Sequence, residues 1–230
     1  MTLVIAHRTA PRDARENSLD GIAAAARLGA DVVEVDARRD RNGDAVLLHD
    51  SWLGRIQKVP LPLRWAPQSL LVHLRVPTLR EALIAAREAG LNVAIDTKDA
   101  KAADAVLTAI DEADAREHVL PWSQHMPVVR AFVRNLPDAE VALLRDTFTP
   151  EQHDRLLADA EAIGARAVSA HQDAVTPAFI AAAAERGLKV LVWYQQLAVQ
   201  EAKLTEVATH GLHGVVTDWP AQARTVVGRL

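Results

Sequence analysis

The sequence predicts an α/β fold, and most simply a closed (β/α)8 TIM barrel that forms a single domain over residues 1–230. Short β-branched runs alternate with alanine-rich amphipathic stretches from one end of the chain to the other, as in repeated βα units around a parallel sheet. Eight such runs can be counted, which is the number of strands that closes this kind of barrel. A length of 230 residues with 50% hydrophobic composition also suits one well-buried domain.

The predicted strands are short, and most of them end in polar residues. They cover residues 3–7, 31–37, 92–98, 118–123, 140–145, 166–171, 189–195 and 214–219. Clear helices are predicted within 18–29, 78–90 and 176–187. The glycines that suit left-handed C-caps are Gly29, Gly90 and Gly187. The threonines that suit N-caps are Thr78, Thr149 and Thr176, and proline follows the last two at the first helical position.

One βα unit is irregular. After the second strand, Asn42-Gly43 predicts a turn into an extra short strand, and residues 50–76 then show no clear period. In a barrel this segment is an excursion on the rim at the C-terminal ends of the strands, where active sites are built. A doubly wound open sheet fits the alternation almost as well, but no glycine-rich phosphate loop follows any predicted strand, so its nucleotide-binding form loses support.

The composition favours a small-molecule partner. The 26 basic and 30 acidic residues are interspersed and give a net charge of -4, so there is no basic face for nucleic acid. The absence of cysteine excludes disulfides, thiolate metal sites and cysteine nucleophiles. No segment approaches the roughly 18 apolar residues of a membrane span, and the N-terminal run has no charged leader. We therefore expect a soluble, cytoplasmic monomer or homodimer without stable membrane insertion.

Polar residues gather at the predicted strand ends. In VVEVDA, residues 32–37, a strand would send Glu34 and Asp36 out of one face and Val33 and Val35 out of the other. The other strand-end groups are His7-Arg8, His49-Asp50, Asp96 with Lys98, and Thr217-Asp218. A barrel brings all these ends to one mouth.

Three carboxylates at one mouth would repel each other by on the order of several kcal/mol unless a cation lay between them. Oxygen ligands favour Mg²⁺ or Ca²⁺ over Zn²⁺, which prefers histidine and thiolate. Arg8 and Lys98 suit phosphate oxygens, and His7 and His49 suit the roles of general base and acid. Together these groups predict metal-assisted cleavage of a phosphate ester.

A series of short elements resembles the glycerophosphodiester phosphodiesterase family. In chain order they are AHR (6–8), REN (15–17), VVEVDA (32–37), VLLHDSWLGR (46–55), VPTLREAL (76–83), IDTK (95–98), VLVWY (190–194) and GVVTDWP (214–220). Each element alone is weak evidence. Their order and their placement at strand ends make the combination specific, and it runs from the first strand to the last.

This resemblance implies one barrel domain, with a rim excursion at about 50–76, that hydrolyses a small glycerophosphodiester to glycerol 3-phosphate and an alcohol. It implies a divalent cation, Mg²⁺ or Ca²⁺, and an attack by the glycerol hydroxyl that forms a cyclic phosphate, which water then opens. The residues that match the family's site are His7 and His49 as the acid-base pair, Glu34, Asp36 and Asp96 as metal ligands, Glu16 as a ligand or site-shaping group, Arg8 and Lys98 as phosphate contacts, and Trp193 as a pocket aromatic.

The chain departs from the family pattern at two positions near the predicted site. Thr9 stands where glycine is usual, which restricts the loop or places a hydroxyl there, and Asp96 stands where a longer glutamate is usual. Two other functions stay open, and the departures at Thr9 and Asp96 motivate the second of them. One is lysophospholipase D-type cleavage of lysophospholipids, for which LPLRW and SLLVHL in the excursion supply apolar surface. The other is a barrel that binds a phosphodiester without turnover.

A few further residues near strand ends have simpler expected roles. Thr217 and Asp218 are expected to cap the last helix. Trp122 and Trp219 are expected to be packing residues at the rim. For His171, packing and facing the mouth are equally good interpretations.

Overall fold

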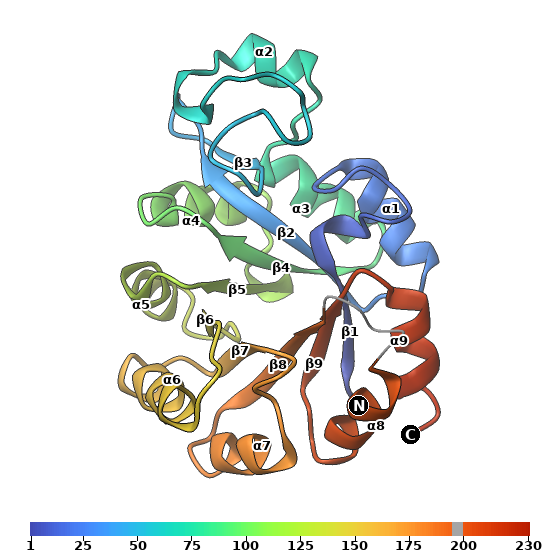
Figure 1. The fold of residues 1–230 in the computed structure, drawn as a ribbon. Coiled ribbons are helices and arrows are strands. Elements are labelled where there is room, and N and C mark those ends of the chain that lie inside the picture. The colour runs from blue at the N-terminus through green and yellow to red at the C-terminus, as the bar shows by residue number, and fades with distance from the viewer. Residues whose placement is uncertain (195–199) are drawn as a thin grey trace.

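The computed structural model, which describes residues 1–194 and 200–230, confirms the predicted (β/α)8 barrel. Eight parallel strands form a ring in the order β1, β2, β4, β5, β6, β7, β8, β9, and the ring closes where β9 pairs with β1. The helices surround the strands, and both chain termini lie on one side of the molecule (Figure 1). Because the strands are parallel and the ring is closed, their C-terminal ends meet at one mouth.

The elements lie close to their predicted positions. The strands are β1 Leu3–Ala6, β2 Val32–Arg39, β3 Ala45–Leu47, β4 Asn92–Thr97, β5 Val119–Ser123, β6 Ala142–Arg145, β7 Ala167–His171, β8 Lys189–Tyr194 and β9 Gly214–Thr217. The α-helices are α1 Leu19–Arg27, α2 Gln68–His73, α3 Leu79–Glu88, α4 Ala103–Glu112, α5 Met126–Asn135, α6 Pro150–Ala162, α7 Pro177–Ala184, α8 Glu201–Thr209 and α9 Pro220–Val227. Short 3-10 turns are η1 His7–Thr9, η2 Leu63–Trp65 and η3 Arg116–His118. Gln195, the last residue of a predicted strand, lies outside the described residues.

Alternation along the strands separates two apolar layers. Val33 and Val35 belong to the large cluster between the strands and the helices, which confirms that these two valines point outward. Val32 belongs instead to a smaller cluster inside the ring, with residues such as Trp122 and Val216. Inward positions further along the same strands therefore face the mouth.

The predicted helix ends are confirmed. The hydroxyls of Thr78, Thr149 and Thr176 each accept the backbone N–H three residues on, and Pro150 and Pro177 begin their helices. Gly29, Gly90 and Gly187 have φ values of 76°, 72° and 69°. These caps fix where each helix stops and so set the lengths of the loops that return to the barrel.

The predicted extra strand and rim excursion are also present. β3 runs antiparallel to the end of β2, and the chain then makes a small lobe containing η2 and α2 above the barrel (Figure 1). The lobe packs around its own apolar cluster, formed by Val46, Leu48, Leu53, Leu63, Ala66, Leu71 and Val76. Arg15 ties it to the barrel by donating to the carbonyls of Leu74 and Arg75.

The first strand is shorter than predicted because a tight turn follows Ala6. Arg8, Thr9 and Ala10 have φ values of 43°, 62° and 57°, a left-handed run that non-glycine residues rarely adopt. The Thr9 side chain is buried, and its hydroxyl accepts the N–H of Ser18 at 3.1 Å. Thr9 therefore braces the turn against the start of α1.

We expect Gly21→Ala to lower the midpoint of thermal unfolding. A Cβ at this position would lie 2.3 Å from the carbonyl oxygen of Thr9, so overpacking should cost about 1–3 kcal/mol. Alanine favours a helix over glycine by about 1 kcal/mol, so without this clash the substitution would raise the midpoint. A higher midpoint would therefore contradict the predicted clash with Thr9. Circular dichroism melting would measure the change, with Ala23→Ser at an exposed position of the same helix as the control.

Candidate active site

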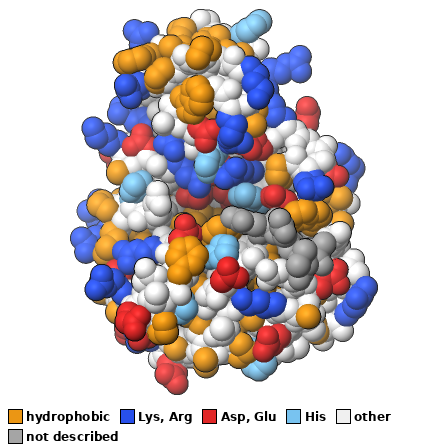
Figure 2. Space-filling model, viewed as in Figure 1, with side chains coloured by type: hydrophobic (Ala, Val, Ile, Leu, Met, Phe, Trp, Pro, Cys, Tyr) orange, Lys and Arg blue, Asp and Glu red, His pale blue; other side chains and the backbone are white. Residues whose placement is uncertain are grey.

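A cavity of about 530 Å³ opens at the C-terminal ends of the barrel strands. Figure 2 shows acidic, basic and histidine side chains gathered around a hollow on this face. The predicted site residues that line the cavity are His7, Arg8, Glu34, His49, Asp96, Lys98 and Trp193. These seven residues therefore meet at one mouth, as the sequence analysis predicts.

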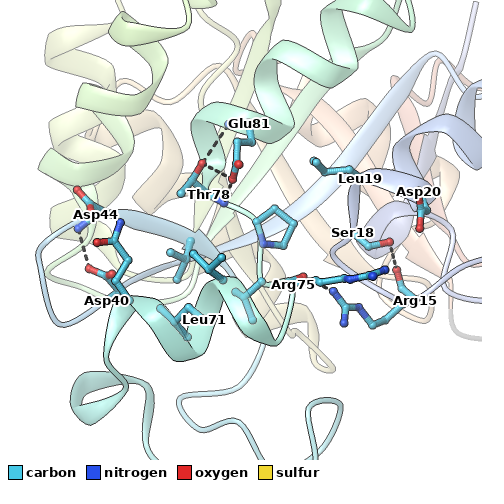
Figure 3. A pocket seen from close by; sticks show the side chains of 15 residues that line it. Arg15, Ser18, Leu19, Asp20, Asp40, Asp44, Leu71, Arg75, Thr78 and Glu81 are labelled. Carbon is cyan, nitrogen blue, oxygen red and sulfur yellow. Dashed lines mark hydrogen bonds between the residues drawn. The ribbon is translucent and has the colours of Figure 1, made fainter.

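A second hollow, of about 640 Å³, lies outside the barrel between α1, α3 and the excursion (Figure 3). Its polar groups already serve the fold. Arg15 holds the excursion, Thr78 and Glu81 cap α3, and Asp40 accepts three backbone N–H groups of the turn at 42–44. None of the predicted site residues, all within the described part of the chain, lines this hollow, so we assign the site to the mouth.

Three buried carboxylates meet at the mouth. Asp36 of β2 and Asp96 of β4 are direct neighbours in the parallel ladder, and Glu34 lies two residues before Asp36 on the same face. Their exposures are 2% for Glu34, 0% for Asp36 and 5% for Asp96. One oxygen of each lies within 4.8 Å of the others. Asp96 reaches this group although it is shorter than the glutamate of the family pattern.

Two cations and one amide offset part of this negative charge. Lys98 Nζ lies 2.6 Å from Asp96 Oδ2 and 3.1 Å from Asp36 Oδ1, and Arg8 Nε lies 3.3 Å from Asp36 Oδ2. Asn17 donates its side-chain N–H to Asp36 Oδ2 at 2.7 Å and accepts the Asp36 backbone N–H at 2.9 Å. Burial acts to raise the pKa of Asp36, but Lys98 and Arg8 outweigh it and lower that pKa below its ordinary value.

Glu34 shows that the local cations do not balance all three acids. Burial, followed by the charge of Asp36, raises the pKa of Glu34 to about 7, and burial also raises the pKa of Asp96. A divalent cation among the three oxygens would remove this imbalance. Because the donors are all carboxylate oxygens, the residues fit a hard cation, and the trio could hold one.

Two histidines at the mouth are each fixed by an aspartate. His7 Nδ1 lies 2.6 Å from Asp218 Oδ1, and His49 Nδ1 lies 2.7 Å from Asp50 Oδ1. Since a carboxylate only accepts, Nδ1 of each ring carries the proton, and Nε2 is left to exchange protons. Burial acts to lower the pKa of His7, but the bond to Asp218 and the charge of Glu34 outweigh it and raise that pKa.

Glu16 lies beside the carboxylate group rather than within it. Its two oxygens accept from Arg55 Nη1 and Nη2, and Arg8 Nη1 lies 3.7 Å away. Arg55 also donates from Nε to Asp50 Oδ2 at 2.6 Å. Arg55 thus connects Glu16 with Asp50 and, through Asp50, with His49.

Some residues at the mouth received other roles, or none, in the sequence analysis. Asp218 was predicted to cap the last helix, and this was wrong, because Trp219 is the N-cap of α9 and no side chain caps it, while Asp218 bonds His7. Trp122 is buried as expected but also lines the cavity. Asn17 could have been found as part of the REN element, since an amide beside a buried acid is a natural partner.

An α/β barrel whose mouth joins buried carboxylates, arginine and lysine side chains and two aspartate-bonded histidines has the groups expected of a barrel hydrolase that acts on phosphate esters. A family model gives the particular membership. Residues 7–222 match the glycerophosphoryl diester phosphodiesterase family, and the chain belongs to it.

Known relatives match along nearly the whole chain. A glycerophosphodiester phosphodiesterase of Caldanaerobacter subterraneus subsp. tengcongensis is 23% identical over 241 residues, which cover 95% of each protein. A phosphodiesterase of Oleispira antarctica, solved in complex with the product sn-glycerol-3-phosphate, matches with a TM-score of 0.83 at 19% identity and covers 99% of this chain and 97% of its own. The glycerophosphodiester phosphodiesterase of Thermotoga maritima matches with a TM-score of 0.80 at 20% identity, covering 98% of both chains. The structural matches support the same barrel.

We expect Asp218→Asn to lower the pKa of His7. The variant removes the negative charge and the strong acceptor that favour the protonated ring. NMR titration of the histidine rings in metal-free protein would measure this pKa, with Asp173→Asn, which changes an acid beside His171 instead, as the matched control. An unchanged or raised pKa of His7 would show that Asp218 does not stabilise the imidazolium.

Proposed function

We propose that this chain, as a single-domain barrel, hydrolyses glycerophosphodiesters to glycerol 3-phosphate and an alcohol with the help of a divalent cation. The observation that carries the proposal is the convergence, at one cavity, of three buried carboxylates, basic side chains that include Arg8 and Lys98, and two aspartate-bonded histidines. Membership of the family supports it, and so does the product complex of the Oleispira antarctica relative.

The carboxylate side of the mouth would bind the phosphate. Glu34, Asp36 and Asp96 would hold Mg²⁺ or Ca²⁺, which would withdraw charge from the phosphoryl oxygens when bound. Arg8 and Lys98 keep free donors beyond their bonds to the acids, so each can also contact a phosphate oxygen. Glu16 would shape the site by fixing Arg8 and Arg55.

The two histidines would move the protons. In the first step the glycerol hydroxyl bonds to phosphorus, the P–O bond to the alcohol breaks, and a proton passes to the departing oxygen. In the second step water adds to the phosphorus of the cyclic phosphate and one ring P–O bond breaks, which gives glycerol 3-phosphate. One ring takes the proton of the attacking hydroxyl at Nε2, and the other supplies the proton to the leaving group. Asp218 and Asp50 keep both rings in the tautomer that this exchange requires.

A soluble diester fits the mouth better than a lysophospholipid. Leu63 and Leu71, from the apolar segments of the excursion, are packed inside its own cluster, and Trp65 is exposed at its surface. Among the described residues, the cavity lining takes none from 50–95. Also within the described residues, the helices include none with the length and apolarity to cross a membrane.

Purified protein with Mg²⁺ or Ca²⁺ should release glycerol 3-phosphate from glycerophosphocholine, measured with a coupled dehydrogenase assay. His7→Ala and His49→Ala should each lower turnover by roughly 100-fold or more, because each removes a proton-transfer group. His118→Ala, at an exposed position in η3, is the matched control and should keep full activity. No release from several glycerophosphodiesters with any divalent cation would refute the proposal and favour a barrel that binds without turnover.

Removal of divalent cations with EDTA should abolish this activity, and added Mg²⁺ or Ca²⁺ should restore it. In calorimetry, Asp96→Asn should weaken cation binding by at least about 10-fold, because one charged oxygen ligand is lost. Asp96→Glu restores the family's usual residue and should retain binding. Asp138→Asn, a change of the same kind at an exposed loop position, should bind like the parent. Equal affinity in Asp96→Asn and the parent would remove Asp96 from the ligand set.

A further inference from the structure

The mouth has two chemically different sides. Its carboxylates, histidines and cations come from the ends of β1, β2 and β4 and from His49, which precedes the excursion. The opposite side is built by β6, β7 and β8 and by residues such as Asp146 that follow β6. It carries no arginine or lysine among the described residues that line the cavity, and its lining includes Leu144, Asp146 and Trp193.

A row of aromatic rings leads from this second side of the cavity to the rim. Trp193 lines the cavity, and the ring of His171 meets it edge-on with centroids 4.5 Å apart. The ring of Phe148 follows, 5.9 Å from His171, and this residue is 66% exposed. His171 therefore lies between Trp193 and Phe148, and the exposed phenylalanine extends an apolar surface outward from the mouth.

Acids flank the row. Asp146 lines the cavity two residues before Phe148, and Asp173 Oδ2 lies 3.3 Å from His171 Nδ1 with its side chain largely exposed. The adjacent Arg145 is paired with Asp159 instead, and within the described residues Asp146 has no ion-pair partner. Aromatic faces and the carboxylate of Asp146 both attract cations, and together they disfavour an anionic group.

We infer that this side of the mouth is the subsite for the alcohol part of the substrate and that it selects a cationic alcohol, above all one with a quaternary ammonium group. The inference rests on the proposed function, in which Arg8 and Lys98 hold the phosphate on the opposite side. A quaternary ammonium group offers no hydrogen-bond donor, so ring faces with nearby negative charge suit it better than a set of polar contacts. Phe148 and Asp146 are the residues that favour binding of a quaternary ammonium alcohol over a neutral alcohol.

Steady-state kinetics on glycerophosphocholine and glycerophosphoglycerol would test the selection, because the two diesters share the phosphate and differ in the charge of one alcohol. We expect kcat/KM to be about 10-fold higher for the cationic substrate, mainly through KM. Phe148→Ala and Asp146→Asn should each bring this ratio toward one. Trp65→Ala, an exposed aromatic on the excursion, and Asp138→Asn, an exposed acid, are the matched controls and should keep the ratio of the parent.

A binding measurement decides the inference independently of turnover. Choline and 3,3-dimethylbutan-1-ol have nearly the same shape, but only choline is charged. NMR titration followed at the indole N–H of Trp193 should give about 10-fold tighter binding of choline, and Phe148→Ala should abolish the difference. Equal binding of the two alcohols, or equal kcat/KM for the two diesters, would overturn the subsite while leaving the proposed hydrolysis intact. Absence of turnover on both diesters would instead count against the proposed function.

Discussion

Three carboxylates are buried next to one another where β2 and β4 end, and the polar structure of the mouth is arranged around their charge. The pairing of Asp36 with Asp96 follows from the strand register, so the barrel itself forces the two acids together. Water is largely excluded, so their repulsion must be offset by nearby groups. Lys98 lies on the same strand face as Asp96. The side-chain amide of Asn17 donates to the Asp36 carboxylate and accepts the Asp36 backbone N–H. Burial, followed by the charge of Asp36, still raises the pKa of Glu34.

The groups that offset this charge also connect the mouth to the excursion. Arg8 contacts both Asp36 and Glu16, and Glu16 accepts from Arg55, which in turn bonds Asp50. A continuous series of ion pairs therefore runs from the buried acids to the partner of His49. Because Arg55 belongs to the excursion, the small lobe has a structural role in the site although its apolar residues pack elsewhere.

The sequence was sufficient to predict the strand order, the inward direction of the acids and their meeting at one mouth, because these follow from alternation and barrel closure. It was not sufficient to predict most side-chain partners. His7 and Asp218 are 211 residues apart and meet only because β9 pairs with β1, so local signals suggested a helix cap for Asp218. The left-handed turn at Arg8 was equally hidden, since it depends on contacts of Thr9 with the start of α1.

A barrel allows the two parts of a phosphodiester to be recognised by different strands. The acids and cations occupy the ends of β1, β2 and β4, and their mutual dependence leaves little freedom to substitute any one of them. The described residues that follow β6 and β7 take no part in that ion-pair series. Asp146 and Phe148 can therefore change without disturbing the charge balance at the carboxylates. Because of this separation, substitutions on the side of β6 and β7 can alter contacts with the alcohol while the carboxylate side stays the same.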